Sequence, residues 1–229
     1  MTRDKKPYRI LIIEDNPGDF IIVDDLLRDQ IFNPFIRHAV DYKQAVAILA
    51  EPDIVFDIIL LDLSLPDKSG QSLINEMLFI APSYPIIILT GYTDIEFSIK
   101  SISQGIYDYL LKDDLNSISL YKSIVYSIER KKTISELISS EKRASDLFNL
   151  SPQPMWIFDE GSFQFAEVND AAVRHYGFTK EEFLNMTIMD IRQVVGLLKT
   201  NDKIESQKET DAEIFKGKFT HRKKSGELI

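Results

Sequence analysis

The sequence predicts a doubly wound α/β sandwich in its first half, followed by a long helix and a smaller domain of different composition. Short apolar runs alternate with helically spaced segments five times in about 120 residues, as in a parallel sheet covered by helices on both faces. Neither glycine nor proline occurs between Gly105 and Pro152, which favours a long uninterrupted helix. Strand-like segments and turn residues return after Pro152.

The expected strands of the first half are short apolar runs. The first, third and fourth consist almost entirely of Ile, Leu and Val, as in strands that are buried on both faces. The runs are Arg9–Ile13, Phe35–Val40, Ile54–Leu61, Pro85–Leu89 and Ile106–Leu111. Helical spacing appears between them, in the sets Phe20, Val23, Leu27, Ile31 and Ile95, Ile99, Ile102.

Residues 116–149 are expected to form one helix, about 50 Å long at 1.5 Å per residue. Tyr121, Ile124 and Ile128 give its first half an apolar stripe that packs on the sheet. Its second half projects and carries a less regular stripe. Two helices with a hinge near Lys131 are the alternative, because Arg130–Lys132 interrupts the pattern.

The region after Pro152 reads as short strands and short helices. Gly177 is expected to end a helix, and Thr179 with Glu182 forms a capping box for the next one. The expected elements are the strands Met155–Phe158 and Phe163–Val168, the helix Asp170–Tyr176, and a hairpin of Gly217–Arg222 with Glu227–Ile229 around the turn at residues 224–226.

Composition excludes several classes of function. The formal net charge of -9 argues against a nucleic-acid surface, and the absence of cysteine excludes disulfides, thiolate metal sites and cysteine nucleophiles. No apolar run reaches the length of about 18 residues that a membrane span requires. We therefore expect a cytoplasmic protein that binds neither nucleic acid nor membrane.

Polar residues follow the expected strands at the edge where open parallel sheets bind their ligands. Glu14 and Asp15 follow the first strand and Asp62 follows the third, so their mutual repulsion calls for a divalent cation such as Mg²⁺. Thr90 and Lys112 follow the fourth and fifth strands. Each residue alone has an ordinary structural explanation. Together they are the groups that phosphoryl transfer to a carboxylate needs.

Four stretches resemble the motifs of response-regulator receiver domains: ILIIEDNPGD, DIILLDLSLPDKSG, IIILTGYTD and GIYDYLLK. The resemblance implies a flavodoxin-like sheet of strand order 2-1-3-4-5 and phosphoryl transfer from a phosphohistidine on a sensor histidine kinase or phosphotransfer protein. It implies the following roles: Asp62 as phosphoacceptor, Asp15 as a direct Mg²⁺ ligand, Glu14 as a ligand through water, Ser64 as a ligand through its backbone carbonyl, Thr90 as the switch hydroxyl, Tyr109 as the aromatic switch, and Lys112 as the phosphate partner.

One position departs from the family pattern, because Asp113 follows Lys112 where the family usually has a proline in a cis bond. A cis bond before a residue other than proline costs about 2.5–4 kcal/mol. We therefore expect a trans bond, and Asp113 and Asp114 as alternative caps of the following helix.

Residues 148–229 resemble a PAS sensor domain, on the stretches NLSPQPMWIF and KGKFTHRKKSGEL and on the segment His175–Glu182. We expect a receiver domain at 1–130, a helical linker at 131–148 and an incomplete PAS-like domain at 149–229. No PAS ligand is implied. No kinase motif is present, so any enzymatic activity is limited to self-phosphorylation and slow self-dephosphorylation of the receiver.

Other functions fit the fold class less well. A dinucleotide-binding enzyme needs a glycine-rich turn where Glu14 and Asp15 stand, and an aspartate phosphatase needs a second aspartate where Ser64 stands. A receiver-like interaction module that works without phosphorylation remains the alternative. We also expect a homodimer that forms through the helix after Asp114.

Overall fold

The computed structural model describes residues 3–91, 95–192, 205–209, 212–216 and 219–229. The chain divides into two compact units, Met1–Leu137 and Ile138–Ile229. Each unit is described by itself. The predicted boundaries after residues 130 and 148 remain a prediction.

The first unit is a five-stranded sheet in the order β2-β1-β3-β4-β5, and every neighbouring pair of strands is parallel. This confirms the predicted doubly wound fold and its strand order. The strands are β1 (Arg9–Ile13), β2 (Phe35–Ala39), β3 (Ile58–Asp62), β4 (Ile86–Thr90) and β5 (Asp108–Leu111). The helices are α1 (Pro17–Gln30), α2 (Tyr42–Leu49), α3 (Gly70–Ile80), α4 (Ile95–Ser103), the short 3₁₀ helix η1 (Lys112–Asp114) and α5 (Ser117–Leu150).

The predicted third strand is too long at its start, since β3 begins at Ile58 and not at Ile54. Phe56 is an apolar loop residue that is buried in the core. The Asp57 side chain accepts a hydrogen bond from the backbone N–H of Arg9 at 2.7 Å. Burial of a loop side chain therefore produced a strand-like pattern.

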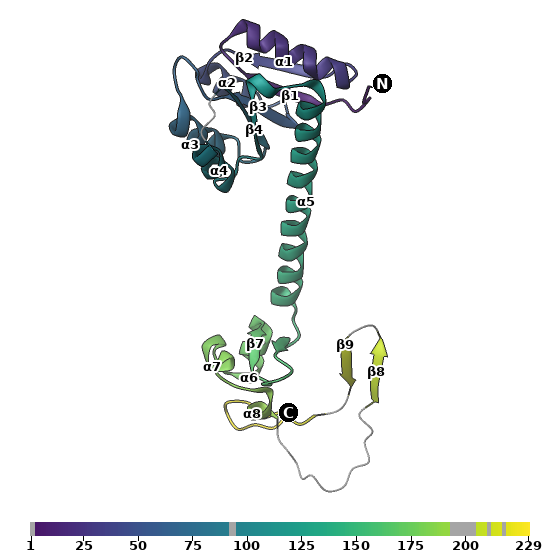
Figure 1. Cartoon of the computed structure of the whole chain (residues 1–229). Helices are drawn as coiled ribbons and strands as arrows, with labels where there is room; N and C mark the ends of the chain where they lie inside the picture. Colours follow the sequence, from purple (N-terminus) through teal and green to yellow (C-terminus); the bar gives the residue numbers. More distant parts are fainter. Residues whose placement is uncertain (1–2, 92–94, 193–204, 210–211, 217–218) are drawn as a thin grey trace. The chain divides into compact units, whose positions relative to one another are not determined.

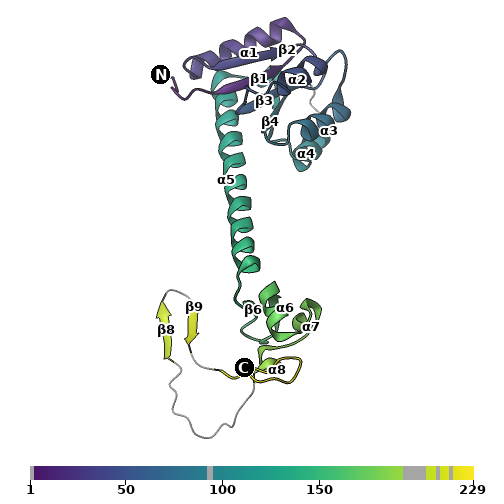
Figure 2. The ribbon, with the colours of Figure 1, turned by 180° about the vertical axis from the view of Figure 1, so that it is seen from behind.

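The sheet is buried on both faces by two layers of helices (Figure 1, and from behind in Figure 2). Alternate residues of β1 and β3 point to opposite faces, as the period of a strand requires. Ile10 and Leu60 lie in the cluster that includes α1 and α5. Leu11 and Leu61 lie in the cluster that includes α2 and α3. This burial gives the strand ends a rigid support.

Helix α5 runs for 34 residues without interruption, so the alternative of two helices with a hinge near Lys131 is wrong. Leu120 and Ile124 are buried against the sheet. The Lys131 Nζ donates a hydrogen bond to the backbone carbonyl of Pro82 at 2.8 Å. The basic break in the apolar pattern is therefore a helical surface, not a hinge. Among the helices that the structure describes, none has the length and apolar character of a membrane span.

The second unit packs short helices against a small antiparallel pair of strands. Its elements are β6 (Trp156–Phe158), β7 (Phe165–Val168), α6 (Asp170–Tyr176), α7 (Lys180–Leu184), α8 (Ile188–Ile191), β8 (Glu205–Glu209) and β9 (Ala212–Lys216). The predicted helix end and capping box are confirmed. Gly177 has a φ of 79° and its N–H bonds the carbonyl of Val173, while Thr179 and Glu182 cap α7 reciprocally.

Two strands, β8 and β9, were missed by the sequence analysis; they pair with each other, and β8 contains no apolar residue that would mark a strand. The predicted hairpin near the end of the sequence exists in reduced form. His221 and Ile229 exchange backbone hydrogen bonds of 2.9 Å, and Arg222 bridges to Leu228. Residues 217 and 218 of that prediction lie outside the described residues.

Candidate active site

Three carboxylates gather at the carboxyl edge of the sheet. Glu14 follows β1 directly and Asp62 is the last residue of β3; they are only 1% and 6% exposed, whereas Asp15 is exposed. One oxygen atom from each carboxylate lies within 4.8 Å of the others. Because β1 and β3 are adjacent in the sheet, two separate stretches of sequence meet in one acidic cluster.

Lys112 supplies a positive charge to this cluster from the end of β5. Its Nζ lies 2.7 Å from Glu14 Oε2, 3.0 Å from Asp62 Oδ2 and 2.7 Å from Asp19 Oδ2. No cis peptide bond occurs among the described residues, as expected for the Lys112–Asp113 bond. Asp113 and Asp114 belong to η1 itself. Lys112 therefore occupies the predicted position although the family proline is absent.

The burial of the charged groups changes their protonation. Desolvation raises the pKa of the Glu14 carboxyl to about 7, against the opposing hydrogen bond from Lys112, and the negative charge of Asp62 adds to the increase. Burial by itself lowers the pKa of Lys112, but the hydrogen bonds to its three carboxylate partners outweigh it and hold that pKa above its ordinary value. The lysine is thus fully charged, and the site has a strong demand for positive charge.

Backbone groups fix the acids in place. The N–H of Ser64 donates to Asp62 Oδ1 at 3.2 Å, and the N–H of Asn16 donates to Glu14 Oε1 at 3.2 Å. The N–H of Gly70, which has a φ of 57°, donates to the carbonyl of Leu63 and closes the loop after β3. Glu14 and Asp62 are therefore each held by a backbone N–H group.

Comparison with known protein families gives a match for residues 10–122 to the response regulator receiver domain. The N-terminal half of the chain is a receiver domain of the response regulator family. Residues 142–212 match the PAS domain model. Both predicted resemblances are thereby confirmed.

Several known proteins are similar to parts of this chain. The transcriptional regulatory protein ZraR of Salmonella typhimurium is 25% identical over 171 residues, which are 73% of this chain and 37% of that protein. The cell cycle response regulator CtrA of Brucella ovis is 31% identical over 104 residues, 45% of this chain and 43% of that protein. The chain thus spans less than half the length of these relatives. NtrX from Brucella abortus shares the fold with a TM-score of 0.51 at 24% identity, over 60% of this chain and 30% of that one.

The receiver places the two predicted switch residues on β4 and β5. Thr90 ends β4, is 1% exposed and pairs in register with Leu111, directly before Lys112. It therefore lies at the same edge as the acids. Tyr109 lies inside β5, three positions before the lysine, and packs partly buried against the cluster that includes α2 and α3.

Two residues at the receiver site were missed by the sequence analysis. Asp19, within the quoted motif ILIIEDNPGD, contacts Lys112. His38 on β2 lies with Nε2 2.8 Å from the backbone carbonyl of Glu14, and its ring stacks on Phe20 at 3.8 Å. The helical position of Asp19 beside the site was a usable signal. No pattern in the sequence indicated the contact of His38.

The donor set of the receiver fits a hard divalent cation. Receiver domains bind Mg²⁺ at an acidic cluster, and Glu14, Asp15 and Asp62 offer only carboxylate oxygens within 4.8 Å of one another. The exposure of Asp15 leaves an open side toward water, which Mg²⁺ retains as ligands.

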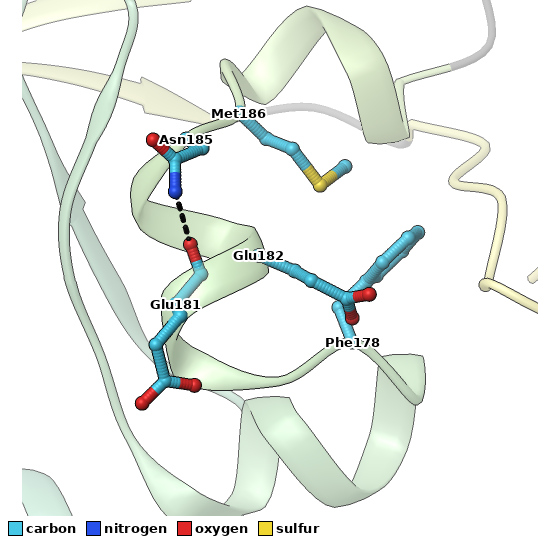
Figure 3. Close-up of a pocket in the computed structure, with 5 residues that line it drawn as sticks. All are labelled: Phe178, Glu181, Glu182, Asn185 and Met186. Carbon is cyan, nitrogen blue, oxygen red and sulfur yellow. Dashed lines mark hydrogen bonds between the residues drawn. The ribbon is translucent and has the colours of Figure 1, made fainter.

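A separate shallow pocket of about 370 Å³ lies in the PAS unit. Figure 3 shows its lining residues on and beside α7: Phe178, Glu181, Glu182, Asn185 and Met186. Glu182 accepts hydrogen bonds from Lys224 and from the backbone of Thr179, and Asn185 donates to the carbonyl of Glu181. These polar groups stabilise the helix and its cap.

Proposed function

We propose that this chain is a phosphorylation switch in which Asp62 accepts a phosphoryl group from a phosphohistidine partner in a Mg²⁺-dependent reaction. One observation carries the proposal: the Asp62 carboxylate lies 3.0 Å from the Lys112 ammonium and shares an oxygen cluster with Glu14 and Asp15. A buried nucleophile, a cation and a cluster of acids are the groups that acyl phosphate formation requires.

The reaction replaces one bond to phosphorus by another. A carboxylate oxygen of Asp62 forms the new bond, and the bond from phosphorus to the donor imidazole nitrogen breaks. The imidazole leaves with the electron pair and takes a proton from water. In the slow self-dephosphorylation, water attacks phosphorus and the bond from phosphorus to Asp62 breaks. The products are the Asp62 carboxylate and inorganic phosphate.

Each residue has a separate task in this proposal. Asp15, Asp62 and the backbone carbonyl of Ser64 would hold the cation directly, and Glu14 would hold it through water. The cation, when bound, would neutralise charge on the phosphoryl oxygens. Lys112 neutralises another of these oxygens.

The remaining residues transmit the change. The hydroxyl of Thr90 donates a hydrogen bond to the phosphoryl group and so moves the end of β4. Tyr109 then changes its rotamer in β5. The neighbouring α5 leads into the PAS unit, so a change at this edge of the sheet has a covalent route to the second unit.

We further propose that the chain forms a homodimer through α5. Ile134, Leu137 and Ile138 fall at i, i+3 and i+4 and are 40%, 59% and 59% exposed, which is unusual for three neighbouring aliphatic residues. A second copy of the same helix offers the matching stripe, as in a parallel coiled pair. In this proposal Ile99, Tyr107 and Tyr109, near the β5 edge of the sheet, add to the contact; the side chain of Ile95 lies outside the described part of the chain.

The test of the phosphoacceptor is chemical. Incubation of the full chain with acetyl phosphate and Mg²⁺ should add one phosphoryl group by intact mass, and EDTA should prevent the addition. Asp62→Asn should add none, while the exposed Asp25→Asn on α1 should behave as the wild type. Labelling that persists in Asp62→Asn contradicts the assignment. No labelling of the wild type would favour the phosphorylation-independent module.

A further inference from the structure

Asp19 is the outermost of the three carboxylates on Lys112. Its side chain is 34% exposed, against 2% for Glu14 and 7% for Asp62. Its Oδ2 nevertheless lies 2.7 Å from the lysine nitrogen, as close as that of Glu14 and closer than that of Asp62. Asp19 is therefore a full partner of the lysine and not a distant neighbour.

The first turn of α1 holds Asp19 in this place. The Asn16 side chain caps the helix and accepts hydrogen bonds from the N–H groups of Gly18 and Asp19 at 2.9 and 3.4 Å. A carboxylate in the first turn is also stabilised by the helix dipole. The next residue, Phe20, stacks on His38. The turn is thus anchored independently of Lys112.

The lysine has no spare donor in this arrangement. An ammonium group carries three N–H donors, and Glu14, Asp19 and Asp62 take one each. A phosphoryl group on Asp62 needs one of these donors as well. Glu14 and Asp62 have tasks at the cation in the proposed function, so Asp19 is the partner that the lysine can release.

We infer that Asp19 is a positioning residue, which holds Lys112 at the site and competes with the phosphoryl group on Asp62 for one of its N–H donors. The inference rests on the proposed function and names a residue that regulates it. The carboxylate of Asp19 adds a negative charge beside the cation site, so it favours cation binding and disfavours an anionic phosphoryl group.

This role predicts that removal of the Asp19 charge changes the affinity for the cation and the affinity for a phosphoryl mimic in opposite directions. Asp19→Asn keeps the shape and one acceptor oxygen but removes the charge. Cation affinity should then fall, and affinity for a phosphoryl mimic should rise. A purely structural role of Asp19 would weaken both kinds of binding together, and an idle surface pair would change neither.

The experiment measures two affinities of the full chain. Mg²⁺ binding is followed by calorimetry, and beryllofluoride binding is followed by fluorine NMR at saturating Mg²⁺. We expect Asp19→Asn to bind Mg²⁺ about two- to fivefold more weakly and beryllofluoride about two- to fivefold more tightly. Asp19→Glu should restore wild-type behaviour in both. Asp25→Asn, the same charge change on an exposed position of α1, should change neither.

Three outcomes overturn the inference. They are unchanged affinities in Asp19→Asn, a loss of both affinities, or equal effects of Asp25→Asn. In each of these cases the wild type still binds Mg²⁺ and beryllofluoride, and the proposed function stands. A wild type that binds neither, while Asp62→Asn behaves identically, removes the proposed function and the inference with it.

Discussion

The two units of the chain build their cores in different ways. In the receiver, β1, β3 and β4 are aliphatic and lie between two helical layers, so the sheet is buried on both faces. In the described part of the PAS unit, the core is formed mainly by one cluster of aromatic side chains. Trp156, Phe165, Tyr176 and Phe183 meet edge to face at centroid distances between 5.2 and 6.1 Å. The aromatic pairs add specific geometry to a small core.

This difference decides where each unit can hold charge. The receiver supports Glu14 and Asp62 at strand ends whose backbones are fixed by neighbouring strands. The PAS unit instead uses its polar side chains as caps. Asn169, 0% exposed, accepts from the N–H groups of Met155 and Ala172 and donates to the carbonyls of Phe148 and Gln153. The receiver therefore holds buried carboxylates at its strand ends, whereas the PAS unit buries a neutral amide whose hydrogen bonds are all to backbone groups.

The largest expected effects come from truncating each core. Leu60→Ala should destabilise the receiver by about 2–5 kcal/mol and Phe183→Ala the PAS unit by about 3–5 kcal/mol, since both side chains are 0% exposed. Denaturant unfolding separates the two, because the single tryptophan, Trp156, reports the PAS unit. Leu60→Ala should shift the far-UV circular dichroism transition and leave the tryptophan transition in place.

The matched control for the core is Ile22→Ala on α1, where the side chain is 57% exposed. Its effect should stay within about 0.5 kcal/mol. A single transition that moves equally in Leu60→Ala and Phe183→Ala would show that the two units unfold together, and the contrast between them would then be lost.

An effect of intermediate size is expected when charged residues replace the exposed apolar residues of α5, since this should prevent dimer formation. The double substitution Leu137→Glu and Ile138→Glu places like charges on the proposed dimer stripe, so light scattering at tens of micromolar should change from dimer to monomer. Ser139→Glu, an exposed position on the other side of the helix, should remain dimeric. A monomeric wild type at that concentration excludes the dimer.

The smallest expected effect is a dependence of the stability of the PAS unit on pH. Burial lowers the pKa of His221, with the nearby positive charge of Arg192 as a second cause. The unfolded chain therefore binds a proton at His221 more readily than the folded chain does. The stability of this unit should be fully present above the unfolded pKa of about 6.5 and decrease as the pH falls below it.

The matched variants for this pH dependence are two histidine substitutions. His221→Gln should flatten the dependence of the tryptophan transition between about pH 7 and 5, because it removes the group that takes up the proton. His175→Gln, on an exposed side chain of α6, should leave the slope unchanged. Equal slopes in all three proteins would assign the pH dependence to other groups.

Much of the architecture was predictable because it depends on local patterns. Continuous aliphatic runs such as Ile10–Ile13 indicate a strand that is buried on both faces, and acids that directly follow such runs lie at one edge of a parallel sheet. The capping box of Thr179 and Glu182 and the helix stop at Gly177 involve residues within one turn of each other. Such local patterns involve residues that are close together in the sequence, so they can be recognised without knowledge of the tertiary structure.

The contacts that complete the site depended on the tertiary structure. Asp19 and Lys112 are 93 positions apart, and His38 reaches the carbonyl of Glu14 across 24 positions. Such pairings depend on which strands are adjacent and on where each helix begins, and hydrophobic periodicity reports neither. The strands β8 and β9 were missed for the same reason, since their pairing with each other and not their own sequence pattern makes them strands. Sequence alone thus determined the fold and the chemical groups of the site, while the packing of distant segments decided which charges share the lysine.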